Sequence, residues 1–149
     1  MRILADTNIL ISALLYPKSN PAKALYHAAD NHDFVLSDHN ISEFRRIAKE
    51  KFSKTQADID LFLTELTYEL ILAPEAPQKL ISDPKDAPIL NAAIIENVDI
   101  IISGDKHFLS LDLERPKVLT VAMYLDNAKE EIERPGGEPG ANRVIRDYY

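Results

Sequence analysis

Short apolar runs alternate along the chain with segments in which apolar residues recur every three or four positions. Five short runs predict β-strands, at 2–5, 34–37, 69–73, 99–103 and 117–121. The periodic segments predict helices, near 9–15, 21–30, 41–48, 55–68, 87–98 and 123–131. Asp6, Thr7 and Asn8 are good cap residues for the first of these helices, and Pro21 suits the start of the second.

Strands separated by helices favour parallel pairing, because a crossover helix is needed to return the chain to the same edge of the sheet. We therefore expect an α/β fold, a three-layer α/β/α sandwich with a central parallel sheet of four to five strands. In such sheets the functional crevice lies beyond the carboxyl ends of the strands, where the strand order reverses. We therefore expect the catalytic or binding residues at that edge of the sheet.

The length of 149 residues fits one domain. We place this domain at 1–132 and a C-terminal tail at 133–149, where three of the four glycines cluster. The tail ends in an apolar and aromatic stretch, 144–149, which is either disordered or docks on a partner protein or a second subunit.

The net charge of −7 and the isoelectric point near 5.0 argue against a protein that binds nucleic acid through bulk positive charge. A polyanionic partner would need local neutralisation, which a bound divalent cation supplies. The chain has no cysteine, and its four histidines show no short paired spacing, so a zinc site is not expected. No apolar run reaches the roughly 20 residues that span a bilayer, and we expect a cytoplasmic protein.

Two carboxylates follow the two clearest strands: Asp6 ends the first, and Asp105 follows the run at 99–103. Asp86 stands at the start of the helix at 87–98, and Glu43 lies beside the apolar stripe of its helix. Each has a plain alternative, as a turn residue, a helix cap or a solvated helix residue. Parallel topology nevertheless brings Asp6, Asp86 and Asp105 to one edge.

Carboxylates within a few Å of each other repel and need protons or a metal ion. With oxygen ligands and no Cys or paired His, the matched ions are Mg²⁺ and Mn²⁺.

Four short motifs in order resemble the PIN-domain nucleases, nearest to the VapC-type toxins of toxin–antitoxin systems. They are Ala5-Asp6-Thr7-Asn8, the isolated helical Glu43, Asp83-Pro84-Lys85-Asp86 and Ile102-Ser103-Gly104-Asp105. The similarity extends to about residue 125 and implies a PIN-like fold. Carried over by position, the catalytic acids are Asp6, Glu43, Asp86 and Asp105. The resemblance makes Asp6, Asp86 and Asp105 the metal ligands and gives supporting roles to Thr7, Asn8 and Ser103.

The resemblance implies an endoribonuclease that hydrolyses phosphodiester bonds with Mg²⁺ or Mn²⁺. Single-stranded RNA is the expected substrate, because it can bend into a narrow acidic crevice whereas a duplex would need a broad basic surface. Four basic residues are candidate RNA contacts, with a solvated surface as the alternative: Arg45, Arg46, Lys49 and Lys106. The partners implied are an antitoxin protein and a second copy of the chain, as a homodimer or higher oligomer.

Three other classes of protein share some of these sequence features. A PIN-fold protein that binds RNA or a partner without cleavage is the main alternative, although a scaffold has no need of a repulsive acidic cluster. A receiver-like phosphoacceptor domain carries two adjacent acids after its first strand, and here Asp6 is followed by Thr7. A phosphatase with two Asp residues in one short motif also fits poorly, because Asn8 stands in place of the second carboxylate.

Overall fold

Five parallel strands form one sheet in the computed structural model, which describes residues 1–73, 87–111 and 113–133. The strand order is β3-β2-β1-β4-β5, and every neighbouring pair is parallel. The strands are β1 (Arg2–Ala5), β2 (Asp33–Ser37), β3 (Glu69–Ile71), β4 (Ile100–Ile102) and β5 (Lys117–Leu119). The chain builds outward from β1 to β3 and then continues on the other side of β1, so the strand order reverses between β1 and β4.

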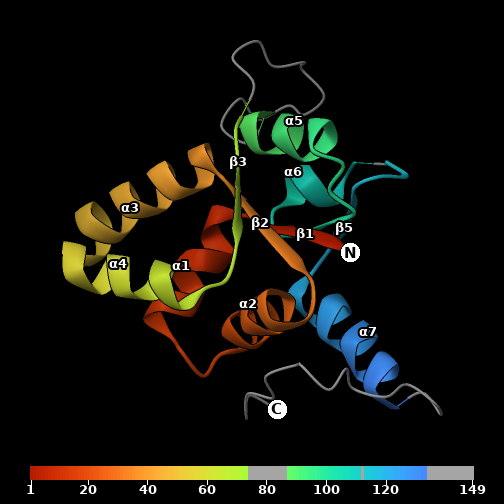
Figure 1. Ribbon diagram of the computed structural model, residues 1–149, viewed down its shortest axis with the longest axis horizontal. Helices are drawn as coiled ribbons and strands as arrows, with labels where there is room; N and C mark the ends of the chain where they lie inside the picture. Colours follow the sequence, from red (N-terminus) through yellow and green to blue (C-terminus); the bar gives the residue numbers. More distant parts are fainter. Residues whose placement is uncertain (74–86, 112, 134–149) are drawn as a thin grey trace.

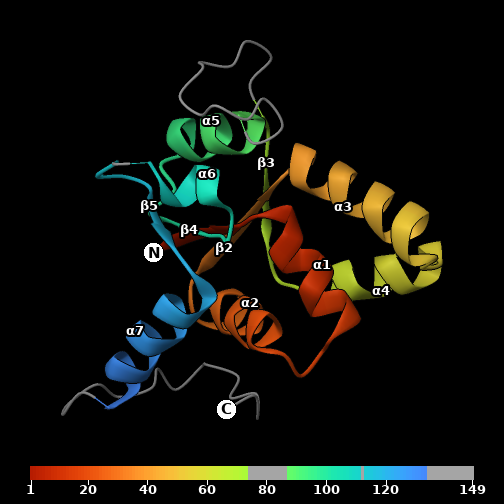
Figure 2. The ribbon, with the colours of Figure 1, turned by 180° about the vertical axis from the view of Figure 1, so that it is seen from behind.

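Helices cover both faces of this sheet, as Figures 1 and 2 show. They are α1 (Thr7–Leu15), α2 (Asn20–Asn31), α3 (Asp38–Phe52), α4 (Gln56–Glu65), α5 (Ala87–Ile95), α6 (Lys106–Leu109) and α7 (Val121–Glu133). One core cluster joins the sheet to α1, α2, α3, α4 and α7, and a second joins it to α5 and α6. The predicted three-layer α/β/α sandwich with a parallel sheet is therefore confirmed.

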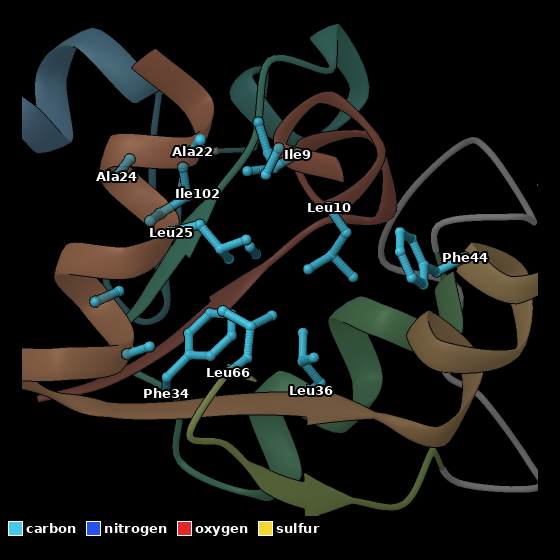
Figure 3. Close-up of a cluster of buried hydrophobic side chains, with 14 of the residues drawn as sticks. Ile9, Leu10, Ala22, Ala24, Leu25, Phe34, Leu36, Phe44, Leu66 and Ile102 are labelled. Carbon is cyan, nitrogen blue, oxygen red and sulfur yellow. The ribbon is translucent and has the colours of Figure 1, made fainter. Parts of the chain in front are cut away.

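The two-residue period of the strands divides the core between the two faces. Ile3 and Ala5 of β1 pack in the first cluster, whereas Leu4 between them packs in the second. The same alternation holds in β2, where Phe34 is in the first cluster and Val35 in the second. Figure 3 shows Phe34, Leu36 and Ile102 of the sheet facing helix residues such as Leu10 and Leu25. Because both faces are covered, the inner residues of β1, β2 and β4 are apolar and buried, whereas charged residues stand at the amino ends of β1, β2, β3 and β5.

Several predicted limits shift by a few residues in the structure. The fourth helix ends at Glu65 rather than near 68, and the last begins at Val121 rather than at 123. The short helix α6 is not predicted, because four residues are too few to show a helical period.

The proposed tail at 133–149 lies, apart from its first residue, outside the described residues, so the domain division stays a prediction. Among the helices described, none is both long and apolar enough to cross a membrane.

Candidate active site

Asp6 stands at the junction between β1 and α1, at the carboxyl end of the central strand. It is the N-cap of α1, and its Oδ1 accepts a hydrogen bond from the backbone N–H of Ile9 at 3.1 Å. Its backbone N–H donates to Ile102 of β4 at 3.0 Å. Only 4% of Asp6 is exposed, which is rare for a carboxylate without a charged partner.

Ser103 connects Asp6 to Asp105. Its buried hydroxyl donates a hydrogen bond to Asp6 Oδ2 and accepts one from the backbone N–H of Asp105 at 3.0 Å. Asp105 caps α6, and its Oδ1 accepts from the backbone N–H of His107 at 2.8 Å. The structure thus brings Asp6 and Asp105 together at the switch point between β1 and β4, where the sequence predicts a functional crevice.

Among the described residues, basic side chains do not neutralise the charge of this pair. Within the part of the chain that the structure describes, no Lys or Arg forms an ion pair with Asp6 or Asp105. Burial raises the pKa of Asp6 above its ordinary value of 3.8, and the charge of Asp105 raises it further. The Ser103 hydroxyl and the backbone N–H groups of Ile9 and Asn8 lower this pKa, but the net shift is upward. A cation at this place would relieve both causes of the increase.

The supporting residues Thr7 and Asn8 lie in the first turn of α1. Thr7 is buried, and its Oγ1 accepts a hydrogen bond from Asn40 Nδ2 at 3.4 Å, whereas the side chain of Asn8 is exposed. Asn40, in the first turn of α3, is not among the site residues expected from the sequence. The signal that could have shown it is the spacing of Ser37 and Asn40, which form a capping box at the start of α3.

Glu43 lies one turn into α3 and is partly buried, with 23% of its side chain exposed. Its Oε2 is 3.7 Å from Nε2 of His39, one turn earlier on the same helix. The α3 helix packs against α1, whose first turn follows Asp6. Glu43 therefore lies on a helix that packs beside the Asp6 junction, although no hydrogen bond joins it to Asp6 or Asp105.

Asp86, the remaining predicted acid, lies outside the described residues, immediately before α5. Within residues 1–73, 87–111 and 113–133, no three His, Asp or Glu side chains lie near enough together to hold a metal ion. Asp6 and Asp105 supply hard oxygen donors, which fit Mg²⁺ or Mn²⁺ in chemistry. The two carboxylates would supply only part of a ligand set for such an ion, and the third ligand expected from the sequence is Asp86.

The four basic candidates for RNA contact differ in their surroundings. Arg45 pairs with Asp60 of α4 at 2.6 Å, and Arg46 is 3.5 Å from Glu50. Lys49 and Lys106 are exposed, and neither forms an ion pair with any residue that the structure describes. Of the four, Lys49 and Lys106 therefore have charges that remain available to a phosphate.

Comparisons with known proteins agree with this architecture. The profile of the PIN domain family matches residues 2–107, a span that includes Asp6, Glu43, Asp86 and Asp105. Among solved structures, the fold is similar to a chain in the crystal structure of VapBC2 from Rickettsia felis bound to a DNA fragment from their promoter. The TM-score is 0.63 and the identity 20%, over 80% of this chain and 98% of that chain. No curated protein matches the chain.

Proposed function

The chain belongs to the PIN-domain family, and from this premise we propose that it is a metal-dependent ribonuclease that cleaves phosphodiester bonds in single-stranded RNA. The observation that carries the proposal is the pair Asp6 and Asp105, linked through Ser103 at the switch point of the sheet without a basic partner among the described residues. Two carboxylates of which one is buried are unfavourable together when both are charged, unless a positive charge lies near them.

In the proposed site, Asp6 and Asp105 hold Mg²⁺ or Mn²⁺ together with Asp86. When bound, the ion supplies charge stabilisation at the phosphate and lowers the pKa of a water molecule. Glu43 orients the attacking water from α3. Ser103 keeps the two carboxylates at a fixed separation, since its hydroxyl contacts the side chain of one and the backbone of the other.

The choice of single-stranded RNA rests on charge and shape. The net charge of −7 argues against the broad basic surface that a duplex needs. A single strand can bend so that one phosphate enters the acidic edge while its neighbours meet separate basic residues. Lys106, which directly follows Asp105, and Lys49 on α3 are the residues we assign to those neighbouring phosphates.

The proposal extends to the partners of the protein. Its fold is similar to that of a chain in VapBC2 of Rickettsia felis, and its motifs resemble those of VapC-type toxins. We therefore infer a cytoplasmic toxin that pairs with an antitoxin protein and forms a homodimer or higher oligomer. Residues 133–149 are the segment we assign to partner binding.

The test is cleavage of a labelled single-stranded RNA by the purified protein. We expect cleavage with Mn²⁺ or Mg²⁺, none with EDTA, and a rate about 100-fold or more lower for Asp6→Asn, because the ion contributes several kcal/mol to the transition state. Equal cleavage by the Asp6→Asn protein would refute the site. RNA binding without cleavage under any metal condition would favour the non-catalytic PIN-fold protein instead.

A further inference from the structure

Asn40 lies on the other side of Asp6 from Ser103, and its polar side chain is completely buried. Its Oδ1 accepts hydrogen bonds from the backbone N–H of Ser37 at 3.2 Å and from Ser37 Oγ at 2.9 Å. Its Nδ2 donates to the carbonyl oxygen of Ala5 at 3.3 Å and to Oγ1 of Thr7 at 3.4 Å. Every polar atom of this amide therefore has a partner.

The plain explanation of the buried Asn40 side chain is that it caps α3. This explains the contacts of Oδ1 with Ser37 but not those of Nδ2 with Ala5 and Thr7. In the capping box, the Ser37 hydroxyl accepts from the backbone N–H of Asn40, and Asn40 Oδ1 accepts from the backbone N–H of Ser37. This exchange needs an acceptor at position 40, and Glu or Gln is the usual residue there. The Nδ2 group plays no part in the cap, and it reaches instead from α3 to the end of β1.

The two groups that Nδ2 contacts stand on either side of Asp6 in the chain. Ala5 is the last residue of β1, and Thr7 is the first residue of α1. A buried carbonyl at a strand end needs a donor, and an amide that also contacts the first helical residue fixes the turn between the two. Asn40 thus contacts the backbone of the residue before Asp6 and the side chain of the residue after it, while Ser103 contacts the Asp6 carboxylate.

Glu43 follows Asn40 by three residues, so the two side chains lie one turn apart on the same side of α3. The contact between Asn40 and β1 therefore also sets how far the Glu43 turn lies from Asp6. We propose that Asn40 is a positioning residue of the metal site, an inference that rests on the proposed nuclease function. Its side chain fixes Asp6 and the Glu43 turn of α3 relative to each other.

The experiment measures Mn²⁺ binding by calorimetry for the unsubstituted protein, Asn40→Ala and Thr55→Ala, at a temperature where all three are folded. Thr55 caps α4, and its Oγ1 accepts from the backbone N–H of Asp58 at 3.1 Å, so Thr55→Ala is a control that loses a helix cap away from Asp6. We expect both substitutions to lower the melting temperature. Only Asn40→Ala should weaken Mn²⁺ binding, by about 10–100-fold, which is the usual effect of removing a group that orients a metal ligand.

Thr7→Val is the milder second variant, in case Asn40→Ala does not fold. It removes one of the two Nδ2 acceptors and nearly keeps the volume of the side chain, and we expect a smaller loss of Mn²⁺ affinity. If the folded variants at positions 40 and 7 bind Mn²⁺ as tightly as the unsubstituted protein, Asn40 is only a helix cap and the inference is overturned. If the unsubstituted protein itself takes up no Mn²⁺, the proposed function fails first, and the inference with it.

Discussion

The two ends of the parallel sheet both carry acidic side chains, but they neutralise them differently. At the amino end, Arg2 Nη1 lies 2.7 Å from Glu69 Oε2, and its Nη2 lies 4.0 Å from Glu96 Oε2. Asp99, before β4, pairs with Arg115 at 3.0 Å and accepts a hydrogen bond from the backbone N–H of Arg2 at 2.9 Å.

At the carboxyl end, the described partners of Asp6 and Asp105 are the Ser103 hydroxyl and backbone N–H groups. Hydrogen bonds from neutral groups orient a carboxylate but leave its charge in place. Glu69, Glu96 and Asp99 at the amino end thus have arginine partners within the chain, whereas Asp6 and Asp105 at the carboxyl end hold negative charge that an external cation can balance. We propose that this contrast separates a structural edge from a functional one, and most of the predictions below compare the two.

The largest expected effect is on RNA cleavage, in Asp105→Asn compared with Asp99→Asn. Asp105→Asn removes one of the three proposed ligand carboxylates and should slow Mn²⁺-dependent cleavage about 100-fold or more. Asp99→Asn removes an acid of the other end, and the rate per folded molecule should stay unchanged. Initial rates on a labelled single-stranded RNA measure both, and equal losses in the two variants would contradict the contrast.

The next effect concerns Ser103, whose hydroxyl contacts the Asp6 carboxylate and the backbone N–H of Asp105. Ser103→Ala keeps both acids but removes the hydroxyl that contacts each of them, and Mn²⁺ affinity should fall about 10-fold. Ser19→Ala is the control, because Ser19 caps α2 and contacts neither acid. Calorimetric dissociation constants decide the matter: an affinity unaffected by Ser103→Ala would show that the bridge is not needed.

The acids of the site can be predicted from the sequence, whereas the residues that hold them in place cannot. Asp6 and Asp105 each end a short apolar run, and parallel strands bring such ends to one edge, so their meeting follows from the local pattern. The Ser103 bridge depends on β4 being the neighbour of β1, and the reach of Asn40 depends on β2 being the other neighbour. Strand order is a long-range property, which is why sequence reasoning identified Ser103 only through a family resemblance and did not identify Asn40.

More of the fold than of the site can be predicted from the sequence. β4 is predictable from three consecutive isoleucines, and most helices from their apolar period and caps. α6 was missed, because its start depends on the Asp105 cap rather than on a period. The role of Asp86 remains a prediction from sequence, since it lies outside the described residues.

A third prediction concerns stability without metal, where the two ends should respond with opposite sign. The raised pKa of Asp6 means that burial and repulsion outweigh its hydrogen bonds, so its charged form destabilises the fold. In EDTA at pH 7, Asp6→Asn should therefore raise the free energy of unfolding, by on the order of 1 kcal/mol. Asp99→Asn should lower it, because Arg115 and the Arg2 N–H lose a charged partner. Urea denaturation of both variants is the measurement.

The pH dependence of this difference follows from the direction of the shift. A carboxyl group with a raised pKa in the folded state contributes most to stability below its ordinary pKa of 3.8, and this contribution is lost as the pH rises through the folded value. The advantage of Asp6→Asn over the unsubstituted protein should therefore shrink as the pH is lowered from 7 toward 4. A gap that is constant over this range would show that the charge of Asp6 is not its cause.

The smallest effect is expected at the amino end itself. Arg2→Met breaks ion pairs to Glu69 and Glu96 that are partly exposed, and it should cost less than about 1 kcal/mol of stability. Raising the salt concentration should reduce this difference. Mn²⁺ binding should be unaffected, and a marked loss of Mn²⁺ affinity in Arg2→Met would mean that the two ends are not independent.

The most direct test of the central claim is a calorimetric titration of the EDTA-treated and dialysed protein with MnCl₂. If the carboxyl end of the sheet is a cation site, the unsubstituted protein and Asp99→Asn will both show saturable Mn²⁺ binding, and Asp6→Asn will not. An unsubstituted protein that takes up no Mn²⁺, or an Asp6→Asn protein that binds it equally well, would contradict the account.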